Sequence, residues 1–146
     1  MKNEAEQPCV NSISSLKLWE ILKDDPKAFL VDVRTPEEWK EVGIADLSSI
    51  SKSVKLITLF FYNPIFYKNE NFINELEDNF PDKEVKLFFI CKAGGRSLKA
   101  LLEAQENGYK NCYNIEDGFE GNMANSNLLS QEFNGWINNK LPRIYL

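Results

Sequence analysis

The sequence predicts an α/β fold, in which a single domain holds a mostly parallel sheet of about five strands with helices on both faces. Short apolar runs of strand length alternate with segments whose apolar residues have helical spacing. The strand runs are almost continuously apolar, which is typical of strands buried on both faces of a parallel sheet. Crossover helices must connect parallel neighbours, so the alternation predicts a layered architecture.

Each expected element follows from a local pattern. The expected strands are residues 10–13, 29–33, 53–61, 84–90 and 112–115. The expected helices are residues 14–26, 35–43, 69–80 and 97–108, with a last short helix at 133–140 that carries Trp136 and Ile137 inward.

Capping residues fix two of these helices most clearly. Thr35, Pro36 and Glu38 supply an N-cap, a proline at the first helical position and the acid of a capping box. A helix therefore begins directly after the strand FLVDV and ends by Gly43. Gly108 is placed to end the helix that follows the strand at 84–90.

The composition bounds the class of protein. A chain of 146 residues with 43% apolar residues has room for one domain with a real core, which we expect at residues 10–146 behind a flexible arm at 1–9. Lys and Arg number 17 against 22 Asp and Glu, for a net charge of -5. This balance argues against nucleic-acid or membrane-surface partners, so any cationic site must be local.

The cysteines and the chain start predict a cytoplasmic protein. The first ten residues are acidic and lack the apolar segment of a signal peptide, and no uncharged stretch is long enough to cross a bilayer. Three cysteines are too few, and oddly numbered, for a disulfide framework. Of these, Cys112 lies inside an expected strand and is predicted to be an inert core residue, while Cys9 is either an incidental cysteine or a relay thiol.

Cys91 occupies a different environment, because it opens the loop CKAGGRS between a strand and a helix. The chain contains no histidine, so no imidazole activates it. Gly94 and Gly95 permit backbone conformations that turn successive N–H groups towards one point, which forms an anion nest. The helix N-terminus, Lys92 and Arg96 add positive charge, so this loop favours a thiolate at Cys91.

The loop length separates two reaction classes. Loops that hold a tetrahedral phosphate in tyrosine-phosphatase-like and arsenate-reductase-like enzymes typically have the pattern CX5R. Cys91 and Arg96 are instead spaced as CX4R, one residue shorter. A phosphatase or arsenate reductase with this shorter loop stays open as an alternative.

The loop CKAGGRS resembles the active-site loop CRxGxRS of single-domain rhodanese-like sulfurtransferases. The segment FLVDVRTPEEWKEVGI is similar to the family's DVR segment, GYKNCYNIEDGFEGN to its strand and glycine-rich turn, and FNGWINNKLP to its closing helix. The resemblance covers the chain from about residue 10 onwards. VGI stands where many members have GHI, a departure that removes no catalytic group of the loop.

The resemblance implies sulfane sulfur transfer through a persulfide on a catalytic Cys91. It implies a small-molecule sulfur donor such as thiosulfate, a thiol or cyanide acceptor, a protein as a further sulfur acceptor, and no metal or organic cofactor. Loop amides would stabilise the anionic persulfide while the two cations attract anionic donors. The expected substrate-binding residues are Lys92, Ala93, Gly94, Gly95, Arg96 and Ser97. For Ser97, helix capping and hydrogen bonding to the sulfur both stay open.

Other residues are expected to support this loop. Asp32 is predicted to bond to loop amides at a strand end, and Arg34 to pair with Glu38 or Glu41. Residues 117–119 form either a wall of the pocket or a plain glycine turn.

The aromatic stretch at residues 59–67 is predicted to be core strand followed by a loop whose apolar tail covers the pocket or meets a partner. A rhodanese-like module that binds a partner through this stretch, without catalysis, is the remaining alternative.

Overall fold

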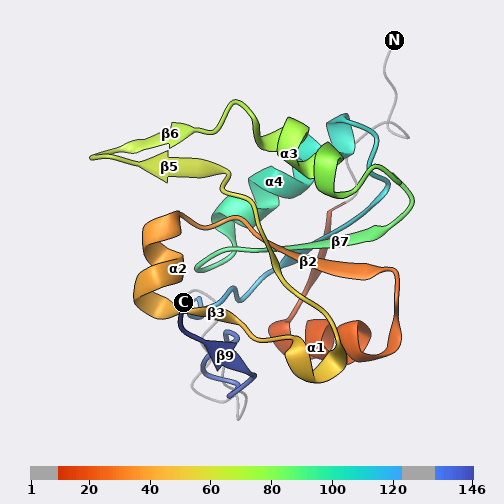
Figure 1. Cartoon of the computed structure of the whole chain (residues 1–146), viewed down its shortest axis with the longest axis vertical. Helices are drawn as coiled ribbons and strands as arrows, with labels where there is room; N and C mark the ends of the chain where they lie inside the picture. The colour runs from red at the N-terminus through yellow and green to blue at the C-terminus, as the bar shows by residue number, and fades with distance from the viewer. Residues whose placement is uncertain (1–9, 123–133) are drawn as a thin grey trace.

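The computed structural model describes residues 10–122 and 134–146, and a five-stranded sheet lies at its centre (Figure 1). The sheet has the order β1-β8-β7-β2-β4, and every neighbouring pair in it is parallel. Its strands are β1 (Asn11–Ile13), β2 (Ala28–Asp32), β4 (Lys55–Leu56), β7 (Lys86–Ile90) and β8 (Asn111–Ile115). The five predicted strand regions all contribute to this sheet.

Helices cover both faces of the sheet, which confirms the predicted α/β fold class (Figure 1). One face packs against α1, and the other face packs against α3 and α4. The helices are α1 (Ser15–Asp24), α2 (Pro36–Val42), α3 (Phe72–Asn79) and α4 (Gly95–Glu106), with a short 3-10 turn, η2, at Ser48–Ile50.

Two small sheets lie beside the main one. A hairpin joins β5 (Phe60–Tyr62) to β6 (Phe66–Lys68), and β3 (Ile44–Ala45) pairs with β9 (Arg143–Ile144) near the C-terminus. Figure 1 shows the hairpin reaching out from the body of the molecule on the same side as α2, beyond the ends of β2 and β7. The sequence patterns predict neither of these pairs.

Alternation along β7 divides the core into two layers. Leu87 and Phe89 pack with the α3 and α4 side, whereas Phe88 and Ile90 pack with the α1 side. All four side chains are buried. Burial of a side chain of this size stabilises the fold by about 2 kcal/mol, so a strand that is apolar on both faces anchors the centre of the sheet.

Helix α2 begins where its capping residues predict. The Thr35 hydroxyl accepts the Glu38 N–H at 3.2 Å, and the Glu38 carboxylate accepts the Thr35 N–H at 3.0 Å. Pro36 occupies the first turn, and Gly43 closes the helix at a φ of 91°. This capping box directs α2 away from the carboxyl end of β2.

The strand predicted at residues 53–61 is much shorter in the structure. Only Lys55–Leu56 pairs regularly with β2, although the N–H groups of Ile57 and Leu59 still donate to the carbonyls of Asp32 and Val33. From Phe60 the chain instead enters the β5–β6 hairpin. The segment at 57–61 therefore bonds first to the end of β2 and then enters the hairpin. A single run of strand-forming residues does not reveal this division.

The predicted closing helix is wrong for the described residues 134–140, which form turns. The backbone N–H of Trp136 donates to Gly118 at 2.9 Å, and that of Ile137 donates to Phe119 at 3.0 Å. A backbone N–H that donates to a distant segment is not available for the hydrogen bonds between successive turns of a helix. The inward position of Trp136 is nevertheless as predicted, because its side chain is buried against the α1 side of the core.

The predicted arm at residues 1–9, including Cys9, lies outside the described residues. The boundary between this arm and the domain stays a prediction. Within residues 10–122 and 134–146, the helices are all too short or too polar to cross a membrane.

Candidate active site

Cys91 follows directly on β7, and its sulfur is held by groups from the loop and from α4. The Gly94 N–H donates to Sγ at 3.1 Å, and Sγ lies 3.2 Å from the Ser97 hydroxyl. Ser97 in turn donates to Oδ1 of Asn114 on β8 at 2.5 Å. Ser97 and Asn114 are buried, so this series of hydrogen bonds fixes the position of the sulfur.

Glycine is required at position 94. Its φ is +106°, and a Cβ there would lie 2.5 Å from the carbonyl oxygen of Glu116. This backbone geometry aims the N–H of Gly94 at the sulfur. Gly94 is also the N-cap of α4, so of the two roles left open for Ser97 the helix cap is not observed, whereas its hydroxyl does lie 3.2 Å from the sulfur.

The turn after β8 supports the loop from behind. The N–H of Phe119 donates to the Cys91 carbonyl at 2.8 Å, and the N–H of Glu120 donates to the Lys92 carbonyl at 3.0 Å. Gly118 has a φ of +64°, and a Cβ there would lie 2.3 Å from the Lys92 carbonyl oxygen. Residues 117–119 thus form a bracing turn, and they are absent from the lining of the pocket that contains Cys91.

Arg96 is bound to Glu38 of α2. Its guanidinium donates to both carboxylate oxygens, at 2.6 and 2.9 Å, and lies 5.3 Å from the centre of the Phe66 ring. Burial opposes the charge of Glu38, but hydrogen bonds from Arg96 and Thr35 outweigh it and lower the pKa of the carboxyl. The predicted pairing of Glu38 with Arg34 is therefore wrong.

Arg34 pairs instead with Asp32, its neighbour at the end of β2. Nη2 donates to the Asp32 carboxylate at 2.7 Å and to the Gly43 carbonyl at 2.8 Å, and the guanidinium lies 4.2 Å from the Phe119 ring centre. Asp32 also accepts the backbone N–H of Arg34 at 3.1 Å, as its predicted bond to a loop amide requires. Both side chains are buried, and neither lines the pocket at Cys91.

A pocket of about 740 Å³ opens over the sulfur. The loop and the first turn of α4 form its floor, α2 forms an acidic wall, and the hairpin contributes aromatic rings. The lining residues are Thr35, Glu37, Glu38 and Glu41 on one side, Tyr62 and Phe66 on another, and Cys91, Lys92, Ala93, Gly95 and Arg96 below. The structure thus brings the predicted loop residues together, with Gly94 and Ser97 placed behind the sulfur.

The aromatic wall agrees with the expectation that the apolar tail of the stretch at 59–67 covers the pocket, whereas the acidic wall on α2 was not among the expected site residues. Glu37 and Glu41 are spaced by one helical turn, which places both on one face of a helix that starts at the end of a sheet strand, and the structure turns this face towards the loop of Cys91. Tyr62 and Phe66 belong to a hairpin whose turn carries Asn63 and Pro64, residues typical of turns. The shared face of Glu37 and Glu41 was the signal in the sequence for the acidic wall, and the structure was needed to show that this face borders the pocket.

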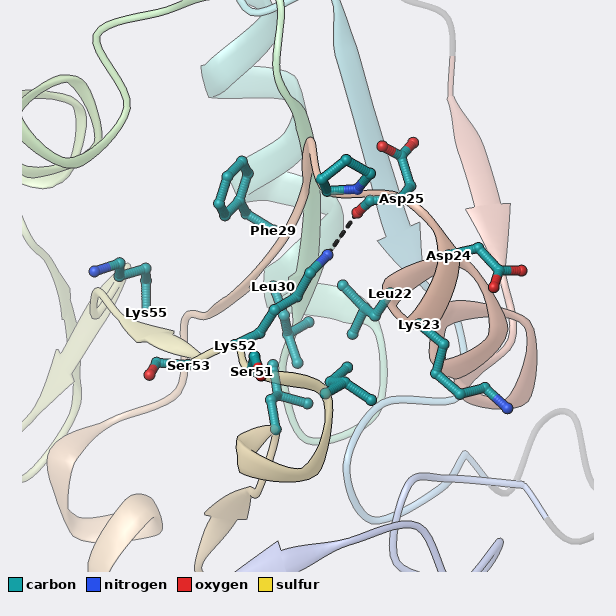
Figure 2. A pocket seen from close by; sticks show the side chains of 13 residues that line it. Leu22, Lys23, Asp24, Asp25, Phe29, Leu30, Ser51, Lys52, Ser53 and Lys55 are labelled. Atoms are coloured by element: carbon teal, nitrogen blue, oxygen red, sulfur yellow. Dashed lines mark hydrogen bonds between the residues drawn. The ribbon is translucent and has the colours of Figure 1, made fainter.

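A second cavity, of about 540 Å³, lies towards the opposite end of β2 and is shown in Figure 2. Lys52 crosses it and donates to the carbonyls of Asp25, at 2.6 Å, and Ala28, at 2.7 Å. Burial lowers the pKa of Lys52, against the attraction of Asp25. This lysine ties the end of α1 to the segment before β4, so we assign the cavity a structural role.

The described residues contain no group of three or more His, Cys, Asp or Glu side chains able to hold a metal ion.

Cys112 is the other described cysteine. It is buried in β8, and burial raises the pKa of its thiol to about 12. Its expected role as an inert core residue agrees with this environment.

Comparisons with known proteins agree on the family. The family described as "STR4 middle domain" matches residues 10–145. A protein of Rickettsia rickettsii, described as "Uncharacterized protein RP600 homolog", is 40% identical over 133 residues, which are 91% of this chain and 96% of the relative. The rhodanese-like domain-containing protein 4 of Arabidopsis thaliana, a chloroplastic protein, is 27% identical over 84% of this chain and 23% of its own length.

Solved structures show the same fold. The crystal structure of Rv0390 from Mycobacterium tuberculosis has a TM-score of 0.76 and 36% identity, and the match covers 92% of this chain and 97% of that one. The polysulfide-sulfur transferase homodimer of Wolinella succinogenes has a TM-score of 0.63 at 23% identity, over 94% of this chain and 80% of its own. The chain therefore belongs to the rhodanese-like family, within the group described as the STR4 middle domain.

Proposed function

We propose that this protein is a sulfurtransferase that moves sulfane sulfur through a persulfide on Cys91. The observation that carries the proposal is the hydrogen bond from the Gly94 N–H to Sγ, at 3.1 Å, on the floor of a pocket. Membership of the rhodanese-like family supports the same chemistry. The remaining loop residues, including Lys92, Ala93 and Gly95, would surround the transferred sulfur.

The reaction has two balanced steps. In the first, the Cys91 thiolate attacks the outer sulfur of a donor such as thiosulfate, a new S–S bond forms, and the old S–S bond breaks as sulfite leaves with the electron pair. In the second, an acceptor thiolate or cyanide attacks the outer sulfur, and Cys91 leaves as a thiolate. Sulfur passes directly between nucleophiles, so neither step needs a metal or an organic cofactor.

The geometry suits the second step especially well. Cys91 is only 1% exposed, so its own sulfur lies at the bottom of the pocket. An S–S bond is about 2 Å long, so the outer sulfur of a persulfide would extend by that distance into the pocket. A fixed N–H donor beside the inner sulfur stabilises negative charge there as the acceptor takes the outer sulfur.

For Arg96 we propose a role other than the expected attraction of anionic donors. Both of its carboxylate contacts go to Glu38, which leaves its charge neutralised by a neighbour. In the phosphatase alternative, the loop arginine must be available to the phosphate, so this pair counts against that alternative. We propose that Arg96 instead locks the loop onto α2.

Mass spectrometry and a transfer assay test the proposal together. After incubation with thiosulfate or an inorganic polysulfide, Cys91 should gain the mass of one sulfur atom, and cyanide should then release it as thiocyanate. Cys91→Ser should do neither, whereas Cys112→Ala should do both. If no sulfane donor adds sulfur to Cys91, the proposal is wrong, and an aryl phosphatase assay on the same samples checks the alternative. The cytoplasmic location stays a prediction.

A further inference from the structure

The pocket over Cys91 carries more negative than positive charge, which bears on what it binds. Glu38 and Arg96 neutralise each other through their hydrogen bonds. Glu37 and Glu41 form no ion pair with any of the residues described, and the lining of the pocket holds one further cation, Lys92. A thiolate or persulfide at Cys91 adds a further negative charge.

This balance disfavours a small dianion such as thiosulfate. A doubly charged anion must pass an acidic helix wall to reach the sulfur, and like charges in a cleft reduce the rate of encounter. A cationic substrate would be attracted by the same field. The negative charge of the pocket therefore favours cationic sulfur donors and acceptors over anionic ones.

The second wall of the pocket is aromatic and continues onto an exposed surface. Tyr62 and Phe66 line the pocket, yet each is 52% exposed, and Ile65 and Tyr67 on the same hairpin are 71% and 52% exposed. Figure 1 shows that this hairpin extends away from the sheet on the side of α2. Apolar side chains gathered at the mouth of a reactive pocket are typical of a protein-binding surface.

The hairpin is fixed to the body of the protein near the site. Lys68 forms an ion pair with Glu103 of α4 at 2.8 Å, Lys99 of α4 lies 5.5 Å from the centre of the Phe60 ring, and Phe66 lies over Arg96. Its aromatic surface is therefore held in position relative to Cys91. A partner bound to the hairpin would extend directly over the sulfur.

From these observations we infer that the thiol partner of Cys91 is a cysteine in a polypeptide segment with apolar and basic neighbours. Aromatic or aliphatic side chains of that segment would pack on Tyr62 and Phe66, and its lysines or arginines would face Glu37 and Glu41. The inference rests on the proposed sulfur transfer and names its substrate class. A membrane of anionic lipids and a second copy of this chain, with its net charge of -5, both fit the acidic wall less well.

Three synthetic peptides with a central cysteine test this inference. One carries aromatic and lysine neighbours, one carries aromatic and glutamate neighbours, and one carries serine and lysine neighbours. Cys91 persulfide is first prepared with polysulfide and verified by mass, and the rate of sulfur transfer to each peptide is then measured. The aromatic, basic peptide should react faster than the acidic one by on the order of tenfold at low salt, and the difference should shrink as salt is added.

Two sets of variants locate the effect. Glu37→Gln with Glu41→Gln should bring the ratio of basic to acidic peptide close to one, whereas the matched pair Glu20→Gln with Glu106→Gln, exposed acids on α1 and α4, should leave the ratio unchanged. Ile65→Ser, at the exposed tip of the hairpin, should slow transfer to the aromatic peptides. Val10→Ser, at an exposed apolar residue elsewhere, should not.

The failure of this inference is distinguishable from failure of the proposed function. If Cys91 takes up no sulfur from any sulfane donor, uncharged organic polysulfides included, the function itself is wrong. If the persulfide forms but transfers equally to all three peptides, only the partner assignment is overturned. Binding of the wild-type protein to anionic vesicles, or its self-association, that is lost in Ile65→Ser without any change in peptide preference would also overturn it.

Discussion

Cys91 and Cys112 are almost equally buried, at 1% and 0% exposure, yet they lie in opposite chemical environments. Cys112 sits within β8, where its thiol donates to the Tyr109 carbonyl at 3.5 Å, and desolvation raises its pKa to about 12. Cys91 sits one residue past β7, where the Gly94 N–H and the Ser97 hydroxyl meet its sulfur. Equal burial thus accompanies two different surroundings, and the groups aimed at the sulfur of Cys91, together with the pocket beside it, are the basis on which we propose that this cysteine reacts.

Removing each sulfur in turn should give the largest contrast. Cys91→Ser should lower sulfur transfer at least a thousandfold, because a hydroxyl cannot form the persulfide. Cys112→Ala should keep transfer and lose only about 1 kcal/mol of unfolding free energy, since it removes one core sulfur. Thiocyanate production and urea unfolding measure the two effects. Comparable loss of transfer in a folded Cys112→Ala protein would break the contrast.

Adjacent glycines provide a matched test of the loop. Gly94→Ala places a Cβ against the Glu116 carbonyl at a φ of +106°, so the loop must change shape and its N–H must move from the sulfur. Transfer should fall roughly a hundredfold. In Gly95→Ala the new Cβ meets no protein atom within 4 Å, so the loop can keep its shape and transfer should fall much less than in Gly94→Ala. Equal rates for both variants would contradict the assigned role of the Gly94 N–H.

The buried hydroxyl of Ser97 should have a smaller effect. Ser97→Ala removes the group between the Cys91 sulfur and Asn114, and leaves Oδ1 of Asn114 without this donor. We expect transfer to fall about tenfold and unfolding free energy to fall by about 1 to 2 kcal/mol. Steady-state kinetics and urea unfolding separate the two. A loss of stability with unchanged kinetics would assign Ser97 to packing alone.

The ion pair between Glu38 and Arg96 should give the smallest effect, and a pH-dependent one. The pKa of Glu38 is below its ordinary value of 4.5 in the folded state, so its contribution to stability is present above that pH and is lost as pH falls through the folded pKa. Unfolding free energies of the wild type and Glu38→Gln should differ by a constant amount above pH 5 or so, and converge in more acid solution. A gap that widens in acid would contradict this sign.

Local sequence patterns predicted most of the fold. Thr35, Pro36 and Glu38 specify the start of α2 through contacts within four residues, and the apolar run through Phe88 and Phe89 specifies a strand buried on two faces. Such patterns failed where long-range contacts decide the outcome. Trp136 lies in turns because its N–H bonds to Gly118, a residue far away in the sequence.

The candidate site also has a part that follows from short-range patterns and a part that depends on long-range contacts. Sequence spacing alone identified the loop, because Cys91, Gly94 and Arg96 lie close together in the chain and act through local backbone geometry. Spacing could not choose the partner of each charge. Arg96 bonds to Glu38 across 58 positions, which removes that glutamate from the pairing predicted for Arg34.

The sequence by itself thus determined the layered α/β architecture, the candidate active-site loop at a strand end and the family, because these depend on short-range patterns. The tertiary structure decided which carboxylate neutralises Arg96, which hydroxyl and amide hold the sulfur, and that an acidic helix and an aromatic hairpin enclose the pocket. The physical reason is that charge pairing and pocket shape depend on distances between segments, and only folding brings those segments together.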